Sequence, residues 1–209
     1  MLVPAVSVVI PAFNEERTIG AVISEVQKAA SSGSVSYEIV VVDDGSVDKT
    51  RIVAKSRNVR VVCNEKNQGK GVALRKGFEC ARGDIIVTID ADGSHDPRDI
   101  GKLVRPILEG ADVVLGCRFA DVQGQGTTTR LNLFGSSIIN ALIWLVTGKR
   151  IGDSQTGFRA FRKKILQEFG ISSEGFEVET ELTVKMLMNG NDVRGVPITI
   201  RRRLTAPLD

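Results

Sequence analysis

Four short runs of β-branched residues, separated by helix-like segments, constrain the fold of this chain most strongly. The runs occupy residues 6–10, 37–42, 59–62 and 84–89. Continuous apolar runs of this length are typical of parallel strands that are covered on both faces. Their alternation with helical segments predicts an α/β fold, in which a mostly parallel sheet is flanked by helices.

Helical periodicity fills the intervals between these runs. Residues 16–30 place Ile19, Val22, Ile23 and Val26 at the spacing of one helix face. The regular alternation of strand and helix ends after about residue 115. The remaining predicted elements are helices at 70–81, 97–108, 130–147 and 177–188, and strands at 112–115 and 193–201.

The length, net charge, and cysteine and histidine content of the chain limit which fold and functions it can have. A chain of 209 residues predicts one α/β domain, residues 1–209, because it is long enough for a full core and short for two. The net charge of +3 is too mild to predict a nucleic-acid partner. Three cysteines without CxxC spacing favour a reduced, cytoplasmic compartment. The single histidine, His95, excludes histidine-rich metal centres and is interpreted as a structural turn residue.

No segment predicts export or a membrane span. The start, MLVPAVSVVIPAF, lacks the basic region of a signal peptide. The longest apolar stretch, 138–146, is far shorter than the roughly 20 residues that cross a bilayer. The helix predicted at 130–147 is apolar beyond one face, which fits either a core helix or one that docks on a membrane surface. The glycine-containing segment 120–129 is interpreted as a mobile loop of the kind that covers a site.

Polar residues follow the predicted strands. Ligands of open parallel sheets bind beyond the carboxyl ends of the strands. Asp43-Asp44 follow the second strand, Asp90-Ala91-Asp92 the fourth and Arg118 the fifth. Each group alone would be an ordinary turn, but their recurrence predicts one shared crevice. Neither a P-loop nor a dinucleotide fingerprint is present, because Gly69-Lys70-Gly71 has the wrong context for both.

Acidic residues in such a crevice point to a divalent cation. Carboxylates and a diphosphate repel each other unless a cation lies between them. Asp90 and Asp92 offer the hard oxygens that Mg²⁺ or Mn²⁺ prefers. The metal would act as a Lewis acid on a departing nucleoside diphosphate. Lys70, at a helix start, could meet phosphate or stay solvated.

The ordered segments VSVVIPAFNEE, EIVVVDDGSVDKT, NQGKGVALRKGF, DIIVTIDADGSHDP, DVVLGCRF and DSQTGFRAFRK resemble family 2 glycosyltransferases of the GT-A fold. Within that family the chain looks most like polyprenol-phosphate hexose synthases, which move mannose from GDP-mannose or glucose from UDP-glucose onto dolichyl-type phosphate. The resemblance implies a nucleotide-sugar-binding half at 1–118, an acceptor-binding half at 119–209, and catalytic, metal-binding roles for Asp90 and Asp92. The donor-binding residues implied are Pro11, Phe13, Glu15, Val42, Asp44, Lys70, Asp90, Ala91, Asp92, Arg118, Arg130 and Arg203.

Two positions depart from the family pattern. Phe13 stands where many relatives have Tyr, so it can stack on a base without donating a hydroxyl hydrogen bond. Ser94 stands where some relatives have Gln, which leaves a coordination position to water. Neither change removes the carboxylate pair.

Three functions remain open, two of which differ in the acceptor. The resemblance implies in-line displacement with inversion at the sugar C1. A polyprenyl phosphate needs no general base, because a phosphate has a second pKa of about 6. A glycan or polysaccharide hydroxyl would need one, and the candidates are Asp153, Glu177 and Glu179. The third alternative is a silent nucleotide-sugar-binding subunit. Clustered arginines favour an anionic acceptor.

Overall fold

A seven-stranded mixed sheet forms the centre of the molecule in a computed structural model that describes residues 5–31, 35–118 and 130–201, without the side chains of 130–137. The strand order is β3-β2-β1-β4-β6-β5-β7. β1 pairs in parallel with β2 and β4, and β2 with β3, as expected. The strands are β1 (Val6–Ala12), β2 (Tyr37–Asp43), β3 (Arg60–Cys63), β4 (Ile85–Thr88), β5 (Val113–Cys117), β6 (Arg159–Arg162) and β7 (Val193–Pro197).

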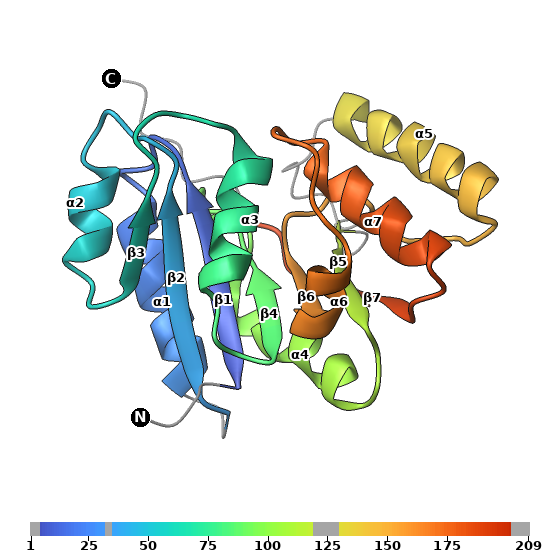
Figure 1. Ribbon diagram of the computed structural model, residues 1–209, viewed down its shortest axis with the longest axis horizontal. Helices are drawn as coiled ribbons and strands as arrows, with labels where there is room; N and C mark the ends of the chain where they lie inside the picture. Colours follow the sequence, from blue (N-terminus) through green and yellow to red (C-terminus); the bar gives the residue numbers. More distant parts are fainter. Residues whose placement is uncertain (1–4, 32–34, 119–129, 202–209) are drawn as a thin grey trace.

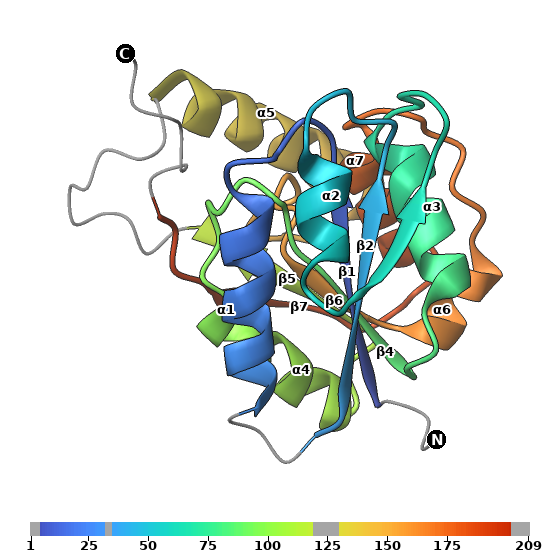
Figure 2. The same ribbon diagram turned by 90° about the vertical axis from the view of Figure 1, so that its left-hand side faces the viewer.

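Helices cover both faces of the sheet (Figures 1 and 2). One core cluster joins α1 (Ile19–Ser31), α2 (Thr50–Lys55) and α4 (Ile100–Leu108) to the first face. The other cluster joins the opposite face to α3 (Lys70–Cys80), α6 (Lys163–Glu168) and α7 (Val178–Met188). The sheet is therefore buried on both sides, as continuous apolar strands require.

The strand that sequence reasoning missed is β6. It runs antiparallel between β4 and β5, so these two strands are not neighbours. Arg159 interrupts its apolar pattern and is nevertheless only 2% exposed. Its guanidinium donates to the carbonyls of Ser154, Thr156 and Glu179, which joins β6 to the first turn of α7. Burial lowers the pKa of Arg159 to about 10.

Element boundaries differ modestly from those predicted. The helix expected at 97–108 is a 3₁₀ turn, η1 (Pro97–Asp99), followed by α4. Asp96 caps this turn by accepting from the Arg98 amide. The last strand, β7, stops at Pro197 and not at residue 201. The segment 120–129, interpreted as a loop, lies outside the described residues.

The helix α5 (Arg130–Thr147) lies beside α7, at the end of the sheet toward which β1 and β2 point (Figures 1 and 2). Ile143 is buried, whereas Leu142, Leu145 and Val146 are 56%, 76% and 64% exposed. In the described part of the chain, no helix combines the length and the apolar character that a membrane span requires.

Candidate nucleotide-sugar site

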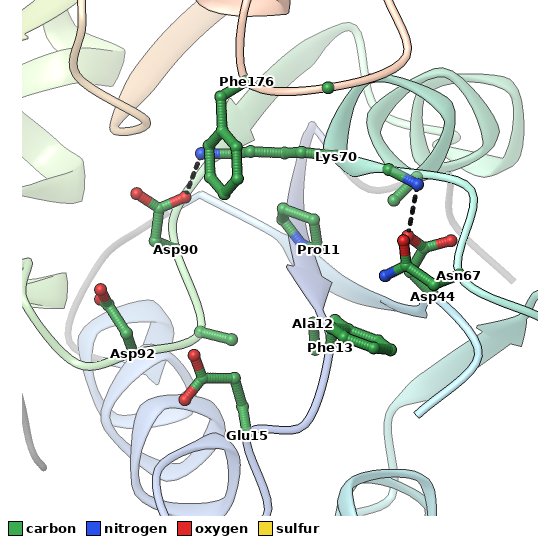
Figure 3. Close-up of a pocket in the computed structure, with 14 residues that line it drawn as sticks. Pro11, Ala12, Phe13, Glu15, Asp44, Asn67, Lys70, Asp90, Asp92 and Phe176 are labelled. Atoms are coloured by element: carbon green, nitrogen blue, oxygen red, sulfur yellow. Dashed lines mark hydrogen bonds and ion pairs between the residues drawn. The ribbon is translucent and has the colours of Figure 1, made fainter. Parts of the chain in front are cut away.

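A pocket of about 470 Å³ opens beyond the carboxyl ends of β1, β2 and β4, where the sequence placed the crevice. Figure 3 shows its acidic side, with Asp90, Asp92 and Glu15, and its far end, with Asp44 and Asn67. Strand ends and the start of α3 supply most of the wall. The lining residues are Pro11, Ala12, Phe13, Glu15, Asp44, Asn67, Gly69, Lys70, Ala73, Asp90, Ala91, Asp92, Gly175 and Phe176.

Asp90 sits at the centre of a charged group. Its Oδ1 lies 2.6 Å from Lys70 Nζ, and its Oδ2 lies 3.3 Å from His95 Nε2. Burial alone would raise the pKa of Asp90, but the Lys70 charge and the hydrogen bond from His95 outweigh it and hold that pKa far below the ordinary range. Asp90 is therefore a carboxylate at any physiological pH.

Gly157 fixes where this carboxylate can lie. A Cβ at position 157 would come within 2.7 Å of Asp90 Cγ, and closer still to both oxygens. The Thr88 hydroxyl, on the strand that carries Asp90, donates to the Gly157 carbonyl at 2.8 Å. The backbone before β6 thus forms the floor on which the Asp90 carboxylate rests, a role that the sequence did not reveal.

Asp92 borders the same pocket and is half-buried. Its Oδ1 accepts from the Ser94 amide at 2.9 Å, which orients the side chain. Among the described residues, no three His, Cys, Asp or Glu side chains are grouped to hold a metal ion by themselves. Two carboxylates suit a Mg²⁺ or Mn²⁺ ion that takes its other ligands from substrate phosphates and water. The residues present therefore fit a metal that binds together with a nucleotide.

Asp44 lines the pocket but is already engaged by the protein. Its oxygens accept from the Asn64 side chain at 2.6 Å and from the amides of Gln68 and Gly69 at 3.1 and 2.8 Å. The carboxylate is only 3% exposed and holds the loop that leads into α3. Its position at the pocket edge agrees with the expectation, and its direct contact with base or ribose stays a prediction.

The end of β1 forms one wall of the pocket. Phe13 lines this wall and is 42% exposed, so part of its ring is accessible to a ligand. Glu15 borders the pocket, and its Oε2 accepts from the Thr18 hydroxyl at 2.8 Å. Pro11 completes the wall.

Two of the expected donor-binding residues do not line this pocket. The Val42 side chain is fully buried in the core cluster under α3, and its contact with base or ribose stays a prediction. Arg118 also lies outside the lining and forms a two-pronged ion pair with Asp153, at 2.5 and 2.9 Å. The Arg130 side chain and Arg203 lie outside the described residues.

Two carboxylates considered as general bases are engaged as well. Burial alone would raise the pKa of Asp153, but hydrogen bonds from Arg118 lower it below its ordinary value. Glu179 Oε1 lies 2.6 Å from Lys70 Nζ, so Lys70 bridges Glu179 and Asp90. The two carboxylates raise the pKa of Lys70 although its burial opposes this.

Two loop residues that the sequence did not single out also line the pocket, Phe176 before α7 and Asn67 before α3. Phe176 is 77% exposed, and Lys70 Nζ lies 5.5 Å from the centre of its ring. Asn67 lines the opposite end of the pocket (Figure 3). A lone aromatic or amide in a loop carries no periodic signal, so only the folded chain reveals their place.

The sheet and the pocket together define a class of protein: an α/β domain whose acidic strand ends face a ligand of nucleotide size. Residues 7–170 match Glycosyl transferase family 2. The chain belongs to that family, and its architecture is the expected GT-A fold.

Two relatives of this chain carry names that state an enzymatic activity. The chain is 33% identical over 188 residues to the dolichol-phosphate mannosyltransferase of Pyrococcus furiosus, covering 86% of this chain and 52% of that protein. It is 34% identical over 168 residues to the undecaprenyl-phosphate 4-deoxy-4-formamido-L-arabinose transferase of Aeromonas hydrophila, covering 77% and 50%. The chain thus spans about half the length of these two relatives.

A solved structure resembles the whole chain. Glucosyl-3-phosphoglycerate synthase from Mycobacterium tuberculosis, in complex with Mn²⁺, uridine diphosphate and phosphoglyceric acid, superposes with a TM-score of 0.78 at 29% identity. The match covers 99% of this chain and 72% of that one. The same enzyme has also been solved with Mg²⁺ and uridine diphosphate.

Proposed function

We propose that the protein is a metal-dependent, inverting glycosyltransferase that moves a hexose from GDP-mannose or UDP-glucose onto a dolichyl or other polyprenyl phosphate. The observation that carries this proposal is the pair Asp90 and Asp92 at a pocket that also presents Phe13 and Lys70. An aromatic face, a cation and two carboxylates are the groups that a base, a diphosphate and a divalent metal require.

The proposed chemistry assigns a task to each group. Phe13 stacks on the nucleobase, and Asp90 with Asp92 holds Mg²⁺ or Mn²⁺ against the diphosphate. The bound metal stabilises the negative charge of the leaving nucleoside diphosphate. Lys70 adds a second positive charge at the same wall of the pocket. Arg118, Arg130 and Arg203 are proposed to contact donor or acceptor phosphates.

The state of the acidic side chains favours an acceptor that is already ionised. Asp153 is paired with Arg118 and Glu179 with Lys70. Glu177 is exposed, and its pKa is lowered by the backbone amides that donate to it, including that of Gly175. The lowered pKa values of Asp153 and Glu177 make these two carboxylates weak proton acceptors. A phosphate acceptor would attack the sugar C1 without their help.

The surface of α5 fits a lipid-borne acceptor. Its exposed Leu142, Trp144 and Leu145 are followed in the chain by the exposed Lys149 and Arg150. The Arg150 guanidinium lies over the Trp144 ring, 5.2 Å from its centre. Apolar groups beside an interfacial tryptophan and basic residues are typical of helices that lie on an anionic membrane surface. We propose peripheral contact with the cytoplasmic face of a membrane through this helix.

The comparisons supply further support. Both curated relatives are named for polyprenyl-phosphate acceptors, and the structural neighbour was solved with a phosphate-bearing acid beside uridine diphosphate. All three of these proteins are thus named for, or solved with, a phosphate-bearing compound that is distinct from the nucleotide. The neighbour also binds Mn²⁺ or Mg²⁺, in agreement with the proposed metal.

The decisive experiment incubates the purified chain with GDP-mannose or UDP-glucose, Mn²⁺ or Mg²⁺, and dolichyl phosphate in detergent. We expect a glycosyl lipid whose anomeric configuration, read by NMR, is opposite to that of the donor. Glycan acceptors with free hydroxyls and no phosphate serve as the comparison. Transfer only to hydroxyls would refute the proposed phosphate acceptor. A protein that binds nucleotide but neither transfers the sugar nor hydrolyses the donor would be a silent subunit.

A further inference from the structure

The ammonium of Lys70 lies between two carboxylates from distant parts of the chain. Its Nζ is 2.6 Å from Asp90 Oδ1, after β4, and 2.6 Å from Glu179 Oε1, on α7. The Lys70 and Glu179 side chains are 13% and 7% exposed. Lys70 and Glu179 are therefore largely shielded from water. Attraction between opposite charges is stronger in such an environment than at the surface.

This arrangement conflicts with metal binding at Asp90. The second oxygen of Asp90 faces His95, so both oxygens already have a donor in the protein. A divalent ion would sit about 2 Å from a carboxylate oxygen. An ammonium on the same carboxylate would be close enough to repel it strongly. Lys70 and a metal ion therefore compete for Asp90.

The main chain at Lys70 is held in place by packing, so only the Lys70 side chain can move when a metal ion approaches Asp90. Gly71 donates its amide to the Glu174 carbonyl at 2.6 Å. A Cβ at Gly69 or Gly71 would collide with the backbone of the loop at Ser173 and Glu174. The start of α3 and the loop before α7 are thus packed backbone against backbone. The flexible tetramethylene stem of Lys70 must make any adjustment.

Glu179 can keep the ammonium when it leaves Asp90. Its Oε2 is buried and has no hydrogen-bond partner among the described residues. A buried carboxylate with unused acceptor capacity attracts a nearby cation. The Phe176 ring, 5.5 Å from Nζ, covers the same position.

We propose that Lys70 is a built-in competitor of the metal, which blocks Asp90 until a nucleoside diphosphate arrives, and that Glu179 is the positioning residue that retains Lys70 when Asp90 is released. The inference rests on the proposed function, since it takes the metal and the diphosphate from it. The phosphate oxygens give the ammonium new acceptors, and the metal then gains Asp90. Metal and nucleotide consequently bind with positive cooperativity.

The test measures Mn²⁺ binding by electron paramagnetic resonance of free Mn²⁺, without nucleotide and with UDP or GDP. For the native chain we expect the nucleotide to tighten Mn²⁺ binding about tenfold or more, within the ordinary range of coupling between two sites. Lys70→Met should bind Mn²⁺ alone about tenfold more tightly and gain little from nucleotide. Glu179→Gln, in which the ammonium relies on Asp90, should bind Mn²⁺ alone more weakly and show a larger gain from nucleotide.

Two controls separate competition from other effects. Lys66→Met removes the same charge from an exposed position near the pocket without touching Asp90, so it reports the field effect alone. Thermal melting checks that each variant is folded. An equal nucleotide-dependent gain in the native chain and Lys70→Met overturns this inference while leaving the proposed function standing. Failure of the native chain to bind Mn²⁺ even with UDP or GDP overturns both.

Discussion

Gly157 and Asp90 are packed so closely that position 157 has no room for a side chain. An added Cβ would lie 2.7 Å from Asp90 Cγ. The glycine is thus required by the neighbouring carboxylate and not by its own backbone, since Gly157 is not among the residues with positive φ. This contact connects the antiparallel strand β6 to the proposed metal site.

Replacing Gly157 with alanine should therefore displace the Asp90 carboxylate with little change to the fold. We expect Gly157→Ala to weaken Mn²⁺-dependent binding of UDP or GDP by about tenfold or more, which corresponds to about 1.4 kcal/mol. Calorimetric titration measures this. Gly101→Ala is the matched control, because nothing lies within 4 Å of a Cβ there. Equal nucleotide affinity in both variants would contradict the role given to Gly157.

Asp92 tests the metal site without disturbing the Lys70 ion pairs. Asp92→Asn keeps the shape of the side chain but removes its charge, so we expect turnover to fall on the order of 10²-fold, as loss of a Lewis acid worth several kcal/mol predicts. Rates are measured over a range of Mn²⁺ concentrations. Asp84→Asn, at an exposed residue directly before β4, should behave like the native protein. Full metal-dependent turnover in Asp92→Asn would exclude the site.

Phe13 tests the proposed stacking of the nucleobase. Truncation in Phe13→Ala should weaken binding of UDP and GDP by about 1–3 kcal/mol, the usual contribution of a base stacked on an aromatic ring. Phe13→Tyr keeps the ring and should bind nucleotide as well as the native chain. Titration in the presence of Mn²⁺ distinguishes the two. If Phe13→Ala loses no affinity, the base lies elsewhere.

The exposed face of α5 tests the membrane contact. The double variant Leu142→Glu, Leu145→Glu should reduce co-sedimentation with vesicles containing anionic lipid about tenfold or more, because each buried leucine contributes about 1.5–3 kcal/mol. Leu108→Glu is the control, since Leu108 is 63% exposed on α4, on the other face of the sheet. Binding that is unaffected by the double variant, or reduced equally by the control, would rule out α5 as the contact.

Acid stability should depend on Asp96. Burial would raise its pKa, but hydrogen bonds from Arg98 and Arg201 lower it to about 2. A depressed pKa stabilises the folded state above the unfolded pKa of about 3.9, and this stabilisation is lost as the pH falls from about 4 to 2. The expected loss is about 2 kcal/mol. Urea unfolding at several pH values should show a shallower decline for Asp96→Asn, and an equal slope would contradict this.

The sequence predicts the parts of the fold that are encoded locally. The five strands predicted up to residue 117 and the helices predicted at 16–30, 70–81 and 97–108 are confirmed, because apolar runs and helical spacing are visible in short windows. The short helix α2, between β2 and β3, was not predicted. β6 was missed because it is only four residues long and carries an arginine at each end, Arg159 and Arg162. The burial of Arg159 is compensated by three backbone carbonyls that only the folded chain brings together.

The residues of the candidate site likewise fall into those that the sequence predicted and those that only the folded chain reveals. Pro11, Phe13, Glu15, Asp44, Lys70 and the Asp90–Asp92 segment follow strands or begin a helix, and all line the pocket as expected. Gly157 and Phe176 could not be found from the sequence, because their roles depend on contacts with residues far away in the chain. The pairing of Arg118 with Asp153 was missed for the same reason.

The antiparallel insertion of β6 also affects the order in which the chain can assemble. Among the residues that the structure describes, β5 pairs with β6 and β7 alone, and both are synthesised later. A nascent chain that ends near residue 118 therefore has no partner strand for β5, and β4 presents an open edge until residues 159–162 emerge. The two halves expected from the sequence, 1–118 and 119–209, thus share one sheet. During translation, the pocket beside Asp90 acquires its floor only after residue 157 and β6 have been made.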